Sequence, residues 1–231
     1  MALSPEGESS FTHFMAYRRT ENVVRRLAAR EQTIVDAARS IAGESGMGAV
    51  QIAAVAHKAD IAAGTVYRYF PSKAHLVAEL ISASADREVA AMRAAADAAP
   101  GPLSALAACL ATFGSRALHE RGLAWAVIAE PVDADIDALR LEFRRALATE
   151  LELRIRTAIA AGHLPDQDAR FAAPAILGAL LEGLLGPLAP SAAADAGAAR
   201  EAVQTITLLA LRSLGVVDAR ARGLVAQCVL P

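Results

Sequence analysis

Apolar side chains recur at three- and four-residue steps along most of the chain, a spacing that places them on one face of a helix. The first such segment spans residues 22–44 and ends before Gly46, a residue type that often stops helices. Short segments follow at 50–57 and 62–69. A long one covers 72–96, and its first residue, Ser72, has a hydroxyl suited to capping a helix. The pattern therefore predicts a succession of helices.

The rest of the chain continues the same period, interrupted by segments that contain proline and glycine. Five further helices are expected, at 103–121, 123–129, 136–161, 169–185 and 198–214. Pro174 falls early in the fourth of these, where it could occupy the first turn or introduce a kink. Residues 1–16 are polar and without a period, so we expect a disordered tail there. This organisation predicts two helical units, at 17–80 and 81–231, joined by the long helix.

Composition supports an all-α fold, because 55% of the residues are hydrophobic and only 4% are aromatic. No apolar run reaches the roughly 18 residues of a membrane span, and the N-terminus lacks the pattern of a signal peptide. We therefore expect a cytoplasmic protein with no membrane partner. Cys109 and Cys228 lie far apart and without neighbouring ligands, so neither a disulfide framework nor a metal site is expected, and no cofactor is indicated.

The formal net charge of −2 hides an asymmetry along the chain. Between Tyr17 and His75 there are nine Lys or Arg residues against five Asp or Glu, a formal charge of +4, so the remainder carries −6. This distribution favours a basic module attached to an acidic one. The arginines at 18, 19, 25 and 26 could extend a DNA footprint, and they could equally form a solvated helix face.

The two short segments are separated by only Lys58–Ile61, which is the length pattern of a helix-turn-helix. Apolar residues would pack the module from inside: Ile52, Ala53, Val55, Ala56, Ile61 and Val66. The outer face of the second helix offers hydroxyls, a guanidinium and flat rings, which suit phosphate oxygens and base edges: Thr65, Tyr67, Arg68 and Tyr69. Gly64 would let the backbone approach a groove, and Lys73 begins the next helix, where amides and an ammonium can meet a phosphate.

Residues 64–73, Gly-Thr-Val-Tyr-Arg-Tyr-Phe-Pro-Ser-Lys, resemble the DNA-binding domain of the TetR family of bacterial regulators, and the resemblance covers about sixty residues. It implies phosphate contacts from Thr65, Tyr69 and Lys73, and base-facing positions for Ala63, Gly64, Tyr67 and Arg68. The chain departs from the family pattern at Gly48, Asp60 and Ala62. Each departure is physically tolerable, and the Gln51 amide is expected to supply a backbone or base contact. The competing interpretation makes Tyr67 and Tyr69 ordinary packing aromatics.

The C-terminal half is expected to hold a ligand pocket, since pockets are mostly apolar with a few placed polar groups. Candidates for its lining are Phe113, Arg116, His119, Trp125, Glu130, Phe143 and Phe171. Each has an alternative as an ordinary core or helix-end residue, which also holds for His163. Small residues at Ala175, Ala179 and Gly183 permit close helix approach. Together with Val203, Ile206 and Ala210 they predict a dimer interface, as the resemblance also implies, with internal core as the alternative.

These features predict a ligand-responsive regulator of transcription, most simply a repressor. It would bind a palindromic double-stranded DNA operator as a homodimer and be released by a small apolar effector. One alternative is a C-terminal domain that binds a protein partner. Another is an enzyme using acid-base groups of the C-terminal half: His119, Glu120, Glu130, His163 and Asp166. Nothing in their spacing resembles a catalytic arrangement, so no enzymatic activity is expected.

Overall fold

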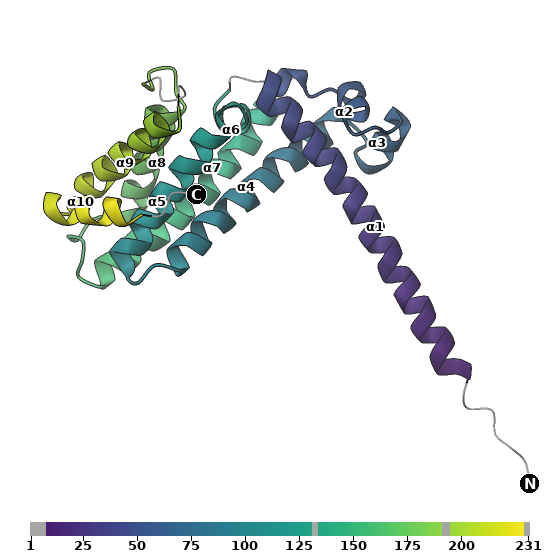
Figure 1. Ribbon diagram of the computed structural model, residues 1–231, viewed down its shortest axis with the longest axis horizontal. Coiled ribbons are helices and arrows are strands. Elements are labelled where there is room, and N and C mark those ends of the chain that lie inside the picture. Colours follow the sequence, from purple (N-terminus) through teal and green to yellow (C-terminus); the bar gives the residue numbers. More distant parts are fainter. Residues whose placement is uncertain (1–7, 131–133, 191–194, 229–231) are drawn as a thin grey trace, which may run out of the picture.

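The computed structural model describes residues 8–130, 134–190 and 195–228, and throughout these ranges the chain forms helices and connecting turns without a strand (Figure 1). The all-α prediction is confirmed. The N-terminal part contains α1 (Glu8–Ser45), a short 3₁₀ helix η1 (Met47–Ala49), α2 (Ile52–Lys58) and α3 (Ala63–Tyr69). The 25-residue helix α4 (Lys73–Asp97) then leads into the C-terminal part.

The C-terminal part is a bundle built around α5 (Pro102–His119). The other helices of the bundle are α6 (Arg121–Ile128), α7 (Ala134–Ala160), α8 (Ala169–Leu184), α9 (Ala196–Ser213) and α10 (Asp218–Gln227). Most of α5 is buried because apolar residues occupy nearly its whole circumference, and α4, α7 and α9 pack around it. A helix that is apolar all round belongs at the centre of such a bundle.

Helix α1 is longer than the sequence pattern predicts, and its N-terminal half projects away from the rest of the molecule (Figure 1). Residues 8–16, expected to belong to a disordered tail, form the start of this helix, because neither glycine nor proline interrupts the stretch after Gly7. The expected tail residues 1–7 lie outside the described residues. The C-terminal half of α1 is packed through buried side chains such as Ile34, Ala38 and Ala42.

Other boundaries agree with the predicted segments to within a few residues, and two features differ. A further helix, α10, follows Val217 and buries only Ala221 and Val225, so its apolar pattern was too sparse to be recognised. Pro174 lies inside α8 beyond its first turn, where its side chain is exposed and its missing N–H leaves out one helical hydrogen bond. Among the described residues, no helix is long and apolar enough to cross a membrane.

Candidate nucleic-acid interface

A tight turn sets the position of α3 relative to α2. Asp60 in this turn has a φ of 52°, a left-handed conformation that aspartate tolerates better than most residues. The amide of Ile61 donates to the carbonyl of Ala56 at 3.0 Å and closes the turn. Val55 and Val66 are fully buried between the two helices, so the crossing is held by packing as well as by the backbone. The predicted helix-turn-helix is present.

The outward side of α3 is open to solvent. Because Val66 faces the core, its neighbour Tyr67 is turned outward and is 52% exposed, and Arg68 is exposed beside it. Ala63 and Gly64 are also exposed, while Thr65 and Tyr69 are half-buried at the edges of this surface. A Cβ atom on Gly64 would meet nothing within 4 Å, so this part of the helix has no protein neighbour. We call the exposed surface of residues 63, 64, 67 and 68 the recognition face.

The start of α4, which follows α3 closely along the chain, offers groups that suit a phosphate. Ser72 caps the helix: its Oγ accepts from the amide of His75 at 3.3 Å and lies 2.8 Å from His75 Nδ1. Lys73 is half-buried in the first turn. The N-terminus of a long helix carries partial positive charge and unpaired amides, so this turn and the Lys73 ammonium attract an anion together. The hydrogen bond from the His75 amide to Ser72 confirms the predicted cap.

At the start of α2, Gln51 has a partner within the chain and Ala53 differs from expectation. The N-cap of α2 is Gln51, whereas Gly48 lies in η1, and the Gln51 side chain makes no capping bond. Its Nε2 instead donates to the Gly48 carbonyl at 2.9 Å, so the amide contacts the backbone of the preceding turn. Ala53 is exposed and does not pack the module as expected, because Ile52 and Val55 already occupy the inner face of the short helix.

The helix-turn-helix is joined to the bundle through α6. Glu130, just after α6, reaches across so that its Oε2 accepts from the amide of Met47 at 2.8 Å. Gly46 has a φ of 80°, and a Cβ atom there would lie 2.9 Å from Glu130 Oε1. Nearby, a Cβ on Gly122 would lie 2.1 Å from the carbonyl oxygen of Gly43, so α1 and α6 cross at a contact that only glycine allows.

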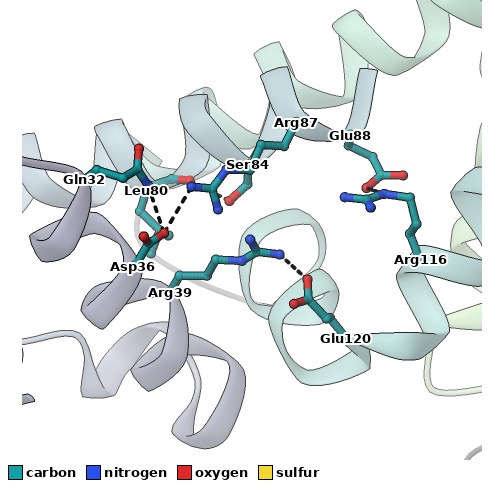
Figure 2. A network of polar contacts seen from close by, with 9 residues as sticks. All are labelled: Gln32, Asp36, Arg39, Leu80, Ser84, Arg87, Glu88, Arg116 and Glu120. Atoms are coloured by element: carbon teal, nitrogen blue, oxygen red, sulfur yellow. Dashed lines mark hydrogen bonds and ion pairs between the residues drawn. The ribbon is translucent and has the colours of Figure 1, made fainter. Parts of the chain in front are cut away.

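Charged side chains extend this junction along α1, α4 and α5 (Figure 2). Asp36 accepts from Gln32 at 2.9 Å and from Arg87 at 3.0 Å, and Arg39 forms an ion pair with Glu120. These contacts connect α1 with α4 and with the corner between α5 and α6. They add polar contacts between the DNA-binding unit and the bundle.

A second pair lies deeper, between Glu88 of α4 and Arg116 of α5, with 2.9 Å between Oε2 and Nε (Figure 2). Burial raises the pKa of Glu88 above its ordinary value even though Arg116 acts in the opposite direction. Glu88 Oε1 is buried and has no hydrogen-bond partner among the described residues. This carboxyl is therefore the least satisfied charge at the junction.

Comparison with known proteins bears on the same segment. Residues 34–80 match the family model "Bacterial regulatory proteins, tetR family". A stretch of 58 residues is 48% identical to the HTH-type transcriptional repressor KstR of Mycolicibacterium smegmatis, covering 25% of this chain and 28% of KstR. The KstR protein of Mycobacterium tuberculosis is 56% identical over 48 residues, 21% of this chain and 22% of the relative. The matches thus span about a quarter of the length of these curated relatives.

Solved structures extend the likeness to the whole fold. RolR in complex with resorcinol superposes with a TM-score of 0.64 at 19% identity, covering 90% of this chain and 98% of RolR. The fatty acid degradation regulator FadR from Bacillus halodurans gives a TM-score of 0.68 at 20% identity, over 81% and 97% of the two chains. A TetR-like regulator from Rhodococcus gives 0.60 at 24% identity, over 81% and 96%. Residues 34–80 are thus similar to the DNA-binding segment of TetR-family regulators, and the likeness of the remaining helices is one of fold.

Two cavities of the C-terminal part share Arg116 in their walls, and a third, of about 310 Å³, lies between α9 and α10. The smaller, about 40 Å³, lies at the junction with α1 and has both Arg39 and Arg116 in its wall. The larger, about 490 Å³, is a groove between α4, α5 and α10. Arg116 lines both. Within the described residues, no group of His, Cys, Asp or Glu is arranged to hold a metal ion.

The structure brings together only some of the residues expected in a pocket. Phe113, Arg116 and Phe143 meet at the smaller cavity, and Arg116 also reaches the groove. His119 is exposed at the end of α5 and Trp125 is half-buried in α6, and neither lines a cavity described here. Glu130 binds η1 instead, and Phe171 is 78% exposed on α8. His119 and Glu130 lie at helix ends and Phe171 faces outward, which explains why these three side chains do not line a pocket.

The residues expected at a dimer interface form two groups, one buried inside the protomer and one at least partly exposed on α8. Val203, Ile206 and Ala210 are buried inside the protomer, where α9 packs on α5 and α8, so they form core and not an outer surface. Gly183 is part of the same packing, since a Cβ there would lie 3.0 Å from Ile206 Cδ1. Ala175 is exposed and Ala179 half-buried on α8.

The sequence interpretation missed the residues of the groove. Four side chains of α5 at four-residue intervals line it, Ser104, Ala108, Thr112 and Arg116, facing a parallel series of alanines on α4. A run of small residues at helical spacing on two consecutive helices was the available signal. It was not distinctive, because alanine at such positions is as common in a closely packed helix pair as in a cavity wall.

Proposed function

We propose that the chain is a repressor of transcription that binds a palindromic double-stranded DNA operator as a homodimer and is released by a small apolar effector. The observation that supports it most directly is the recognition face: Val66 is fully buried while Tyr67 and Arg68 are exposed on the same seven-residue helix. A helix presented this way can enter the major groove with its polar side chains on base edges.

Within this proposal the side chains of α3 and α4 have separate roles. Tyr67 and Arg68, with the small residues Ala63 and Gly64, face the bases. Thr65, Tyr69 and Lys73 contact phosphates at the edges of the recognition face, where they are half-buried. Gln51, exposed and bound through Nε2 to the Gly48 carbonyl, contributes a DNA contact at the start of α2. The DNA-binding domain is assigned to residues 17–80 and the effector and dimerisation domain to residues 81–231.

A homodimer is proposed through the outer faces of α8 and α9. Apolar and small side chains are exposed there at helical spacing, namely Phe171, Ala175 and Gly178 on α8, and Leu209 on α9. Phe171 and Leu209 are 78% and 53% exposed. Exposed apolar side chains that gather on one face mark a surface that a partner can cover. Pairing two such faces would present two recognition helices, which operators with half-sites about 34–36 Å apart require.

Effector release is supported by the groove of about 490 Å³, which is within the size range of small-molecule sites. The similar RolR was solved with resorcinol bound, so the shared fold can hold a small aromatic molecule. The groove favours a small effector over a protein partner, because its walls are concave and bury a ligand on several sides. The effector acts only if it binds the DNA-free and DNA-bound states with different affinity.

Selection of bound sequences from a random DNA pool tests the proposal, followed by fluorescence anisotropy on the selected operator. Arg68→Ala should weaken operator binding by about 1–3 kcal/mol and relax the base preference at one position of each half-site. Lys73→Ala should weaken binding to all sequences alike and lower the salt dependence by about one charge. Arg220→Ala, an exposed arginine of α10, is the control and should change neither. Failure to enrich any sequence would refute DNA recognition.

A further inference from the structure

The groove between α4, α5 and α10 has a regular construction. Along α5 its wall is formed by Ser104, Ala108, Thr112 and Arg116, four residues at intervals of four. This stripe is about 18 Å long at a rise of roughly 1.5 Å per residue. Ala91 and Ala95 of α4, with Ala98 just after its end, form the matching stripe. The side chains that line the groove on both helices are therefore mostly small.

The third wall comes from the C-terminal half of α10, through Leu224, Gln227 and Cys228. Leu224 and Cys228 are half-buried, so α10 covers part of the groove and leaves the rest open. The wall is therefore mainly apolar, and its polar side chains besides Arg116 are Ser104, Thr112 and Gln227. An elongated apolar molecule fits this shape better than a compact polar one.

The charge in the groove is at the opposite end from Ser104. Arg116 closes the α5 stripe there, and its side chain is 34% exposed. Its Nε is engaged by Glu88, a bond that uses one of the five N–H donors of a guanidinium. Arginine is the side chain best suited to a planar carboxylate, which it can bind through two parallel hydrogen bonds. The charge of the groove thus complements an anionic end group.

We propose that this groove binds an elongated apolar carboxylic acid, with its carboxylate on Arg116 and its apolar body between the alanine stripes of α4 and α5. This inference rests on the proposed function, for which it names the effector class and the site. Arg116 also lines the cavity at the junction with α1. A ligand carboxylate on Arg116 competes with Glu88, whose other oxygen is already without a partner among the described residues.

The two cysteines provide a reporter of occupancy at this site. Cys228 lines the groove and is half-buried. Cys109 is fully buried, and burial, with a further contribution from Glu150, raises its pKa to about 12, which keeps the thiol unreactive. In the folded protein, the rate of alkylation by N-ethylmaleimide therefore reports on the accessibility of the Cys228 thiol alone. A ligand in the groove slows this reaction, whereas a ligand bound elsewhere does not.

The test uses straight-chain acids of eight to fourteen carbons and the alcohols of matched length on the full chain. We expect decanoate to slow Cys228 alkylation at least fivefold and decan-1-ol to bind at least tenfold more weakly. Arg116→Gln should abolish the preference for the acid. Ala108→Leu, which fills the middle of the groove, should abolish protection by either, while Ala94→Leu, exposed on α4 outside the groove, should leave it intact. Circular dichroism identifies any variant that does not fold, and the comparison of acid with alcohol on the wild-type chain stands without the variants.

Three results would overturn the inference. One is that no acid of the series protects Cys228, the second that acids and alcohols protect equally, and the third that folded Arg116→Gln still prefers the acid. Operator binding without any acid is measured in parallel. If the chain binds its selected DNA and no acid, the site assignment fails and the proposed function stands. If it binds acid but no DNA, the proposed function fails and the groove remains a carboxylate site.

Discussion

The bond between Glu130 and the amide of Met47 is the contact at the junction whose removal should have the clearest effect. Met47 is 1% exposed, so water cannot easily replace the carboxylate if it is lost. A hydrogen bond to a charged group contributes about 1.5–3 kcal/mol. Glu130→Ala should therefore lower the free energy of unfolding by about 2 kcal/mol. For a chain of this length that corresponds to a fall in Tm of roughly 4–8 °C.

Glu130→Gln keeps an acceptor oxygen without its charge. It should lower the free energy of unfolding by about half as much as Glu130→Ala, since charge-assisted bonds are roughly twice as strong as neutral ones. Gly46→Ala supplies an independent perturbation. It combines a φ of 80° with a Cβ atom 2.9 Å from Glu130 Oε1, and should cost at least about 1–2 kcal/mol. Its effect should add incompletely to that of Glu130→Ala, because both changes remove the same bond.

Thermal unfolding followed by circular dichroism measures all of these variants. Two controls match the perturbations: Gly48→Ala, where no positive φ is needed and a Cβ meets nothing within 4 Å, and Glu79→Ala, an exposed glutamate of α4. Both should unfold like the wild type. Equal Tm values for the wild type and Glu130→Ala, or full additivity with Gly46→Ala, would show that the carboxylate does not stabilise the junction.

Three further perturbations test other parts of the fold. Gly122→Ala should cost about 1–3 kcal/mol, because its Cβ would lie 2.1 Å from the Gly43 carbonyl, whereas the exposed Gly223→Ala should not destabilise; urea unfolding compares them. The pKa of Glu88 is raised in the folded chain, so its ionisation opposes folding, and the wild type should lose stability relative to Glu88→Gln as pH rises above about 4.5. Parallel pH curves for the two proteins would contradict this. Phe171→Asp should shift a dimer to monomer in analytical ultracentrifugation and weaken operator binding, and Leu141→Asp, an exposed leucine of α7, should do neither.

The DNA-binding unit could be predicted from the sequence because its determinants are local. The turn between α2 and α3 depends on adjacent residues, and burial of Val66 fixes which neighbours face outward. The cap at Ser72 is likewise a local hydrogen bond. Helix α1 was predicted only in part. Its N-terminal half projects away from the rest of the molecule (Figure 1), and the sequence there shows no apolar period to recognise.

The C-terminal half was harder to predict because its features depend on which helices meet. Glu130 looked like a pocket residue, and only the approach of η1 makes it a partner of Met47. Val203 and Ile206 carry the apolar pattern that both a core and a dimer interface require, and packing of α9 on α5 decides for the core. The alanines of the groove are small enough for either close packing or a cavity.

The junction also indicates how occupancy of the groove could reach the recognition face. The Arg39–Glu120 and Asp36–Arg87 pairs are partly exposed, with Glu120 and Asp36 46% and 53% exposed, so each is worth at most about 1 kcal/mol. The glycine crossing of α1 with α6 and the Glu130 bond are the stronger connections. The backbone carbonyl of Arg116 accepts from the amide of Glu120, at the corner where α5 ends and α6 begins. A ligand that moves Arg116 therefore acts on α6 through the backbone of this corner, and α6 carries the DNA-binding unit with it.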